Sequence, residues 1–578
     1  MADRPARDLA ERFQSAWLAA YPFAASSYGI PGYDDRVPDQ SEAGDATWRG
    51  QVEGFLAEVA ELRRPAAPAG EGLCPEDAVT LGCVEEAARQ EVDDLDSASS
   101  EHTVTAMPFD GPAQLLAVTA RTILTDEHAA SDYLARLGQA GGWLDRRTER
   151  LRIGAAKGRL PVAPLVEQAI AWGESILAEP VPDAIAAPRL PEGFGGGEAW
   201  LAERDRLAAE VLAPAMARWV QCLRELLPAS RPADRPGLVN LPGGEADYAR
   251  EVRSNTTLDL TPEELHRIGL DEVERLERRG VELGAEIGLD GIEEVRAALR
   301  GAAGRQDPQV AIEQAVAAIR RAEARAGELF PAPLPPPCAV TPMPPLVAAS
   351  GMAPHYTPPR LDGSRPGTFW FNTERPTAGT GWDLEVTAFH EAVPGHHLQL
   401  SRIQMLGQLT SLQRQRSLTV FSEGWGLYAE QLAEEAGLYV GTEGLLGAVI
   451  GSLMRAVRLV VDTGLHAFGW SRERAYEHIV THVPMPEQFL AAEIDRYITI
   501  PGQALAYLTG KREIVRLREE AQRRLGPAFS LPGFHAAVLD QGSLPMPVLQ
   551  QAIASFVDSL ALGGAPGPAL SGGSSATG

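Results

Sequence analysis

The sequence predicts a mainly α-helical fold with one small β-sheet. Long segments carry apolar residues at helical spacing and are rich in Ala, Leu, Glu and Arg, which lose little conformational freedom in a helix. Proline-rich stretches separate these segments, and residues 343–373 alternate short apolar runs with turn residues. We therefore expect helices along most of the chain and strands in this one segment.

The strongest helical patterns are spread over the whole chain. Thr261 is a candidate N-cap, because Pro262 follows at the first helical position and Glu264 three residues after the cap. This helix is expected to end near Ala285. The other strong patterns cover residues 6–21, 133–153, 198–227, 412–436 and 502–525.

Proline also predicts how the chain is organised. The proline-rich stretch at residues 228–242 suggests an N-terminal helical half (1–230) and a C-terminal helical half (231–562) that contains the sheet. Residues 563–578 have the Gly, Ser and Ala content of a disordered tail. The sequence assigns no role to the N-terminal half.

Charge and composition exclude several classes of partner. With 52 Lys+Arg against 78 Asp+Glu, the formal net charge is -26, so we expect no nucleic-acid partner, which would need a basic face. No apolar run approaches the roughly 20 residues of a membrane helix, so no membrane association is expected. The charged N-terminus lacks the apolar stretch of an export signal, which predicts a cytoplasmic protein.

Histidine is concentrated in one part of the chain. Seven of the eleven histidines lie between residues 355 and 482, and three of them occur in the run FHEAVPGHH at residues 389–397. A His-Glu pair on a helix, followed by a histidine that returns to the same face, presents two imidazoles and a general base to zinc in many hydrolases. We therefore expect His390 to bind Zn²⁺ and Glu391 to act as the catalytic general base.

The spacing leaves two alternatives for the second imidazole. In an HExxH motif the second histidine follows one helical turn later, but here Pro394 occupies that position. On an unbroken helix His397 would lie about 10.5 Å from His390 along the axis, which is long for joint ligation. Alternatively, Pro394 and Gly395 loop out and return His396 to the metal. His396 is the favoured ligand and His397 the alternative.

A third ligand is expected on the next helix, because catalytic zinc uses three protein ligands and keeps a fourth position open. Glu423, 27 positions after His396, fits this role. Gly424 and Gly426 beside it lower helix propensity, which suits a place of close approach. Glu430 is either a hydrogen-bond partner of a ligand histidine or a solvated helix charge.

Residues further along the chain supply candidates for stabilising the transition state. Amide hydrolysis builds negative charge on the former carbonyl oxygen, which a Tyr or His donor can meet. His466, Tyr497 and Tyr507 lie on otherwise apolar helices and are the candidates for this catalytic role. Lys511 could meet a substrate carboxylate, although such a lysine is more often a surface charge.

Four motifs in order resemble a known family. HEAVPGHHLQ, FSEGWGLYAE, RLVVDTGLHAFGW and RYITIPGQALAY together resemble the bacterial domain-of-unknown-function family numbered 885. The resemblance covers residues 248–553 strongly and the N-terminal half weakly. It implies a large helical fold similar to zinc metallopeptidases such as carboxypeptidase Taq and angiotensin-converting enzyme, with the small sheet beside the active-site cleft, and it implies zinc as cofactor.

The resemblance also bears on individual residues. The motif of those relatives resembles HExGH, which places His390, Glu391 and His396 in register with two extra residues between Glu and Gly. Glu423 takes the place of their third ligand. The segment 348–355 takes the place of the edge strand along which their substrate lies.

The sequence thus predicts a zinc-dependent hydrolase of small peptide or amide substrates, with Glu391 deprotonating a zinc-activated water. One alternative is a narrow-specificity zinc hydrolase or lyase acting on a small metabolite in biosynthesis, because Leu508 stands where the family often has lysine. A non-catalytic scaffold is the third hypothesis, and an intact Glu391 beside intact ligands argues against it. The substrate, the exo or endo mode and the oligomeric state are not predicted.

Overall fold

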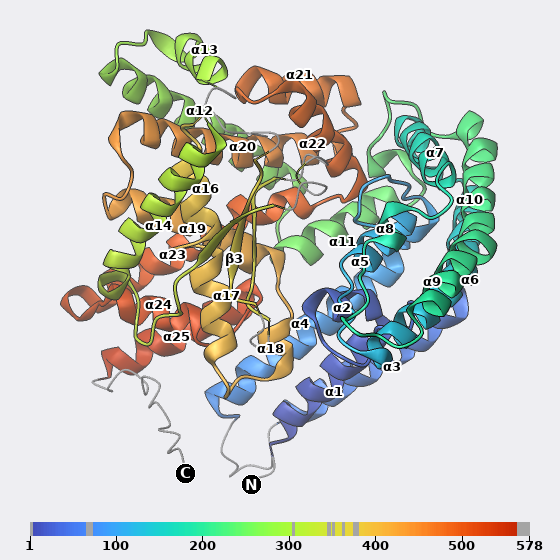
Figure 1. The fold of residues 1–578 in the computed structure, drawn as a ribbon. Coiled ribbons are helices and arrows are strands. Elements are labelled where there is room, and N and C mark those ends of the chain that lie inside the picture. Colours follow the sequence, from blue (N-terminus) through green and yellow to red (C-terminus); the bar gives the residue numbers. More distant parts are fainter. Residues whose placement is uncertain are drawn as a thin grey trace.

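The computed structural model confirms a mainly α-helical fold with one small β-sheet (Figure 1). It describes residues 4–562 except residues 65–72, 303–306, 344–347, 349–352, 361–364 and 374–380. The tail predicted at residues 563–578 and residues 349–352 of the predicted substrate strand lie outside the described residues.

Most helices before residue 230 gather on one side of the molecule (Figure 1). A five-residue π-turn, Ala208–Leu212, joins the last two of them. The helices are α1 (Pro5–Ala20), α2 (Pro22–Tyr28), α3 (Glu42–Leu62), α4 (Pro75–Ser97), α5 (Gly111–Ala120), α6 (Glu127–Ala156), α7 (Ala163–Leu177), α8 (Asp183–Ala186), α9 (Gly197–Leu207) and α10 (Ala213–Leu226).

The helices after residue 230 surround the sheet and the long helix α20. They are α11 (Gly244–Thr256), α12 (Pro262–Glu286), α13 (Gly291–Ala302), α14 (Pro308–Leu329), α16 (Leu384–Glu391), α17 (His396–Met405), α18 (Ser411–Gln415), α19 (Thr419–Glu435), α20 (Gly441–His466), α21 (Arg472–His482), α22 (Glu487–Thr499), α23 (Ala506–Leu525), α24 (Leu531–Leu539) and α25 (Met546–Ala561).

The sheet has three short strands, β1 (Ala339–Pro342), β2 (His355–Thr357) and β3 (Thr368–Phe371). Their order is β1-β3-β2, with β1 parallel and β2 antiparallel to β3. Two of the strands lie in the predicted segment 343–373, and β1 immediately precedes it. Among the described residues β2 is an edge strand, with no strand paired to its outer side.

Local sequence signals place some helix ends correctly and miss others. The predicted capping box is present, since Thr261 caps α12 and the Glu264 side chain returns to its backbone. The segment 412–436, expected as one helix, is instead α18 and α19, because the backbone is extended at Arg416 and Leu418. This break turns Arg416 toward α4, where its guanidinium contacts Glu91 at 3.1 Å.

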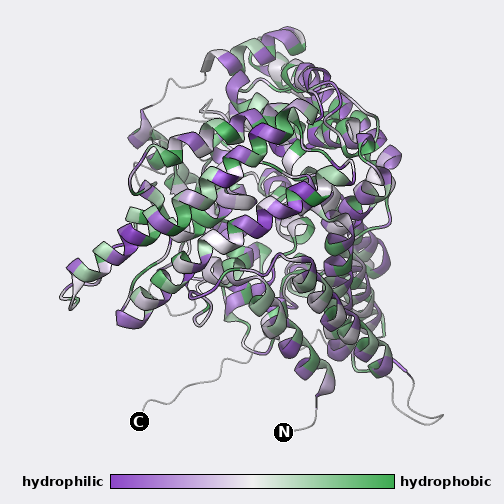
Figure 2. Cartoon of the chain, turned by 90° about the vertical axis from the view of Figure 1, so that its right-hand side faces the viewer, coloured by the Kyte–Doolittle hydropathy of each residue, from purple (hydrophilic) through white to green (hydrophobic). Residues whose placement is uncertain are grey.

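The hydrophobic clusters do not follow the predicted division of the chain. One cluster joins α1, α3 and α4 to α14, α16, α19 and α23–α25. A second lies around α11, α12 and α20–α22, and a third lies mainly within α5–α10. Figure 2 shows hydrophilic and hydrophobic residues alternating along the outer helices, as expected for helices with one buried face. Whether residues 1–230 and 231–562 fold as separate units stays a prediction.

Helix α20 is long and apolar because it is central. By length and composition it could cross a membrane, but 83% of its most apolar window is buried inside the protein. Helix α12 packs along it, and α16 and α21 also contact it. Its apolar length is therefore accounted for by packing in the core.

Candidate metal centre

The histidine run folds as two helices joined by a tight loop. Helix α16 ends one residue after His390, and α17 begins at His396, so the helix breaks where the sequence predicts. Only glycine fits at Gly395, since a Cβ there would overlap the carbonyl oxygen of His390. The indole Nε1 of Trp425 donates to the carbonyl of Pro394 at 3.0 Å and ties the loop to α19.

This loop brings two imidazoles to one carboxylate. His390 Nε2 lies 3.3 Å and His396 Nε2 lies 3.5 Å from Glu423 Oε2. Ligand atoms of His390, Glu391 and His396 also lie within 4.8 Å of one another. Two neutral imidazole nitrogens and a carboxylate are a donor set that suits a divalent transition metal such as zinc.

The neighbouring His397 is engaged elsewhere. Its Nε2 donates to the carbonyl of Pro336 at 2.7 Å, and its Nδ1 accepts from the hydroxyl of Tyr356 at 3.1 Å. Both ring nitrogens therefore have partners outside the cluster of His390 and Glu423. The geometry favours His396 over His397 as the second ligand.

Glu430 contacts the candidate ligand His390 and is not a solvated charge. His390 Nδ1 donates to Glu430 Oε1 at 2.7 Å, and the Glu430 side chain is 3% exposed. Arg455 Nη2 lies 3.9 Å from the same oxygen. Because Nδ1 is held by Glu430, Nε2, which faces Glu423, is the nitrogen that would lose its proton and bind a metal.

Paired charges shift the pKa values of this cluster. Burial alone would lower the pKa of His390, but hydrogen bonds to Glu423 and Glu430 outweigh it and raise the pKa to about 10. Burial alone would raise the pKa of Glu423, but the contacts with His390 and His396 hold it well below its usual range. The metal-free cluster is therefore an imidazolium–carboxylate network.

The two glycines of α19 allow the close approaches that the sequence suggests. A Cβ at Gly426 would lie 2.5 Å from Cε1 of His390, so a larger residue would displace this ring. A Cβ at Gly424 would lie 2.6 Å from the backbone of Gly510 in α23. Gly426 therefore allows contact with the candidate ligand His390, and Gly424 allows contact with α23.

The edge strand contacts the candidate general base directly. The backbone N–H of Tyr356 in β2 donates to Glu391 Oε2 at 2.8 Å. Tyr356 is a site residue that the sequence did not single out. The available signal was the strand pattern just upstream of the histidine run, which places a strand near the site but does not select one residue.

His466, one of the three oxyanion candidates, lies in the core away from the cluster. Its Nε2 donates to the carbonyl of Tyr497 at 3.0 Å, and its Nδ1 accepts from the N–H of Leu238 at 3.2 Å. Burial lowers its pKa to about 3, so the ring is neutral at pH 7. With both nitrogens in use, His466 holds backbone segments together.

The other two oxyanion candidates, Tyr497 and Tyr507, differ in how fully their hydroxyl groups are hydrogen-bonded. Tyr497 Oη donates to Glu493 at 2.7 Å and accepts from Arg458 at 3.0 Å, so its hydroxyl is fully used. Among the described residues, the Tyr507 hydroxyl has one hydrogen-bond partner, Arg496, at 3.5 Å. The Arg455 guanidinium that contacts Glu430 also lies 6.0 Å from the Tyr507 ring, which links this tyrosine to the candidate metal centre.

Comparison with solved structures supports the fold. A crystal structure described as "the putative lipoprotein from Colwellia psychrerythraea" superposes with a TM-score of 0.86 at 25% identity, covering 96% of this chain and 99% of that one. "A putative lipoprotein of unknown function from Shewanella oneidensis" gives a TM-score of 0.72 at 17% identity, covering 94% and 99%.

Comparison of sequences gives the family. No curated protein matches the chain. The family described as "Bacterial protein of unknown function (DUF885)" matches residues 22–553, which include α2 through the first half of α25 and every residue of the candidate metal centre. The chain therefore belongs to the DUF885 family of bacterial proteins.

Proposed function

We propose that the protein is a zinc-dependent hydrolase of peptide or amide bonds. The observation that carries the proposal is the convergence of His390, His396 and Glu423 beside Glu391. A zinc ion bound there would act as a Lewis acid on the substrate carbonyl and lower the pKa of water. The donor set fits zinc, because it combines two histidines and a glutamate with a carboxylate–histidine pair behind one ligand.

The residues around the ligands have distinct roles in this proposal. Glu391 takes the proton from the attacking water and passes it to the leaving nitrogen. The Tyr356 N–H fixes one oxygen of this carboxylate, and no other hydrogen bond to it occurs among the described residues. Its second oxygen is therefore available for the proton. Glu430 holds the His390 ring in the ligating tautomer.

Substrate would lie along the free edge of β2. Main-chain pairing with an edge strand holds an extended peptide through backbone hydrogen bonds, whatever its side chains. Because the Tyr356 N–H already contacts Glu391, the scissile bond of a peptide paired with this strand would lie next to the general base. Tyr507, whose hydroxyl is least engaged, would donate to the developing oxyanion.

A narrow-specificity zinc hydrolase or lyase acting on one small metabolite is the second candidate. Leu508 favours it, because this residue is 3% exposed in the core and offers no cation to a peptide carboxylate. A panel of unrelated di- and tripeptides, blocked at either end, separates the two. Turnover of several unrelated peptides would eliminate the single-metabolite candidate.

The place of action is a separate question. The sequence predicts the cytoplasm, whereas both similar solved structures are described as putative lipoproteins. A lipoprotein would act outside the cytoplasm and meet a different pool of peptides. Cell fractionation followed by immunodetection of the full-length protein decides between the two locations.

Metal analysis is the first test. Purified protein should contain about one equivalent of zinc, and His396→Ala should lose it because a direct ligand is removed. His397→Gln is the matched control and should keep zinc, since His397 bonds to Pro336 and Tyr356. Zinc lost only in the His397 variant, or no zinc bound by the wild type, would contradict the proposal.

Glu391→Gln separates metal binding from chemistry. The substitution preserves shape and hydrogen bonding to the Tyr356 N–H, so zinc content and melting temperature should change little. Removal of the base should reduce kcat about 10²-fold to 10⁴-fold. A variant that keeps more than about a tenth of wild-type kcat would contradict the general-base role.

A further inference from the structure

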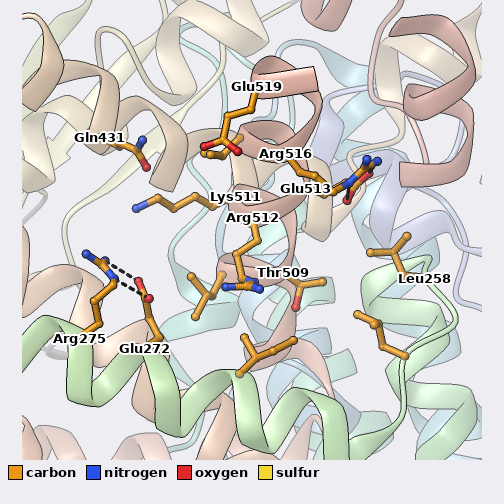
Figure 3. A pocket seen from close by; sticks show the side chains of 14 residues that line it. Leu258, Glu272, Arg275, Gln431, Thr509, Lys511, Arg512, Glu513, Arg516 and Glu519 are labelled. Carbon is orange, nitrogen blue, oxygen red and sulfur yellow. Dashed lines mark hydrogen bonds and ion pairs between the residues drawn. The ribbon is translucent and has the colours of Figure 1, made fainter. Parts of the chain in front are cut away.

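A cavity of about 470 Å³ lies between α12 and α23 (Figure 3). This volume is in the range of small-molecule pockets. None of the residues that line it belongs to the candidate metal centre. Its apolar lining comes from both helices and from the loop before α12, and includes Leu258, Ile268, Leu508 and Val515.

The charges on the wall of this cavity are not balanced among themselves. Arg275 and Arg516 each form an ion pair with a glutamate one turn away on the same helix, at 2.7 Å and 2.6 Å. Lys511 and Arg512 also line the cavity and make no hydrogen bond or ion pair within the part of the chain that the structure describes. In Figure 3 no dashed line joins Lys511 or Arg512 to another of the residues drawn. Glu519 is the one remaining acidic residue on the wall.

Lys511 is unusual in this protein because it is half-buried without an ion-pair partner among the described residues, whereas the neighbouring Arg512 is exposed. The chain carries a formal net charge of -26 and has two lysines. The other lysine, Lys157, forms an ion pair with Glu101 at 2.7 Å. Lys511 is partly buried, and this burial lowers its pKa although Glu430 and Glu272 oppose the change. An anion bound in the cavity would stabilise the charged form of this partly desolvated lysine by pairing with it.

We propose that the cavity binds a small organic anion. Its carboxylate or phosphate group would pair with Lys511 and Arg512, and its hydrocarbon body would lie against Ile268, Leu508 and Val515. This inference goes beyond the proposed hydrolase and does not depend on it, because no candidate metal ligand lines the cavity.

Selective acetylation of lysine tests the site in the full-length protein. The probe is hexanoate, and the readout is the acetylation rate of Lys511 by mass spectrometry, with Lys157 as the internal control. Hexanoate at ten times its dissociation constant should slow acetylation of Lys511 about tenfold and leave Lys157 unaffected. Acetate lacks the apolar body and 1-hexanol lacks the charge, so each should protect far less at equal concentration and ionic strength.

Hexyl phosphate tests whether the anionic group is a phosphate or a carboxylate. If it protects Lys511 from acetylation more strongly than hexanoate does, the ligand is a phosphate. If it protects more weakly, the ligand is a carboxylate. Arg512→Gln should weaken binding of the better anion about tenfold, the loss of one charge-assisted contact. Arg523→Gln, on the same helix outside the cavity, should leave it unchanged. The proposal is overturned if neither anion protects Lys511, if acetate and 1-hexanol protect equally well, or if both arginine variants behave alike.

Discussion

Tyr497 and Tyr507 share a sequence pattern but differ in how their hydroxyl groups are used. The Tyr497 hydroxyl is satisfied by Glu493 and Arg458, whereas the nearest polar partner of Tyr507 lies at 3.5 Å. Tyr507→Phe should therefore lower kcat about 10²-fold with little change in melting temperature, the effect of removing one oxyanion donor. Tyr497→Phe is the matched control and should lower melting temperature more than kcat. Equal losses of kcat in both variants would contradict the assignment.

His466 makes stability depend on pH. Burial lowers its pKa to about 3 from 6.5, so the unfolded chain takes up the proton first as the pH falls. The free energy of unfolding should therefore decrease between pH 7 and pH 5, by about 2 kcal/mol from this residue. His466→Gln keeps a donor and an acceptor for Tyr497 and Leu238 but does not titrate.

Urea denaturation at the two pH values measures this effect. The difference between pH 7 and pH 5 should be smaller in His466→Gln than in the wild type. His128→Gln is the control, because the His128 side chain is 85% exposed and should leave the difference unchanged. Equal pH dependence in the His466 variant and the wild type would show that His466 is not held neutral.

Helices α19 and α23 depend on a glycine contact that no larger residue can replace. A Cβ at Gly510 would overlap the carbonyl oxygen of Val420 in α19. A Cβ at Gly424 would in turn lie 2.6 Å from the backbone of Gly510. Gly510→Ala should push the helices apart, destabilise the protein by about 1 to 3 kcal/mol and weaken zinc binding, since α19 carries Glu423. Thermal unfolding and zinc titration measure the two effects.

Gly327→Ala in α14 is the matched control. No atom lies within 4 Å of the Cβ that this substitution adds, so stability should stay the same or rise slightly. If both alanine variants were as stable as the wild type, close contact between α19 and α23 would not be required.

Local chemistry explains which elements could be predicted from sequence. The start of α12 follows from Thr261 and Glu264, which satisfy the free backbone amides of the first turn and need no distant partner. The break before α19 could not be predicted in the same way. It coincides with a contact between Arg416 and Glu91, which are separated by 325 positions. Helix propensity carries no information about such a contact.

The same distinction applies to the candidate site as a whole. His390, His396 and Glu423 lie within one stretch of the chain, and the Pro-Gly break between the histidines is visible in the sequence. Tyr356 and Arg455 reach the centre from separate elements, β2 and α20, and only the packing of those elements shows their roles. Spacing thus predicts the candidate ligands, and tertiary structure supplies the residues that orient them.

At the scale of the molecule, the N-terminal helices form part of the core around the candidate centre. Buried residues of α1, α3 and α4 share one hydrophobic cluster with α19 and α25. Polar contacts also cross residue 230, including Arg416 with Glu91 at 3.1 Å and Arg159 with Asp247 at 2.8 Å. Without residues 1–230, the apolar faces of α18 and α25 that pack on α1 and α4 would be exposed to water.

We therefore expect residues 231–562 expressed alone to lack cooperative unfolding and to bind zinc poorly, because α25 and α18, the helix that leads into α19 and its Glu423, lose their packing on α1 and α4. Co-expression of residues 1–230 as a separate chain should restore a soluble complex with a single thermal transition, since the cluster and the ion pairs require proximity but no covalent link. Size-exclusion chromatography and calorimetry measure both outcomes. A fragment 231–562 that melts sharply near the temperature of the full-length protein would instead establish the predicted C-terminal half as an independent folding unit, with the N-terminal helices packed on a core already complete.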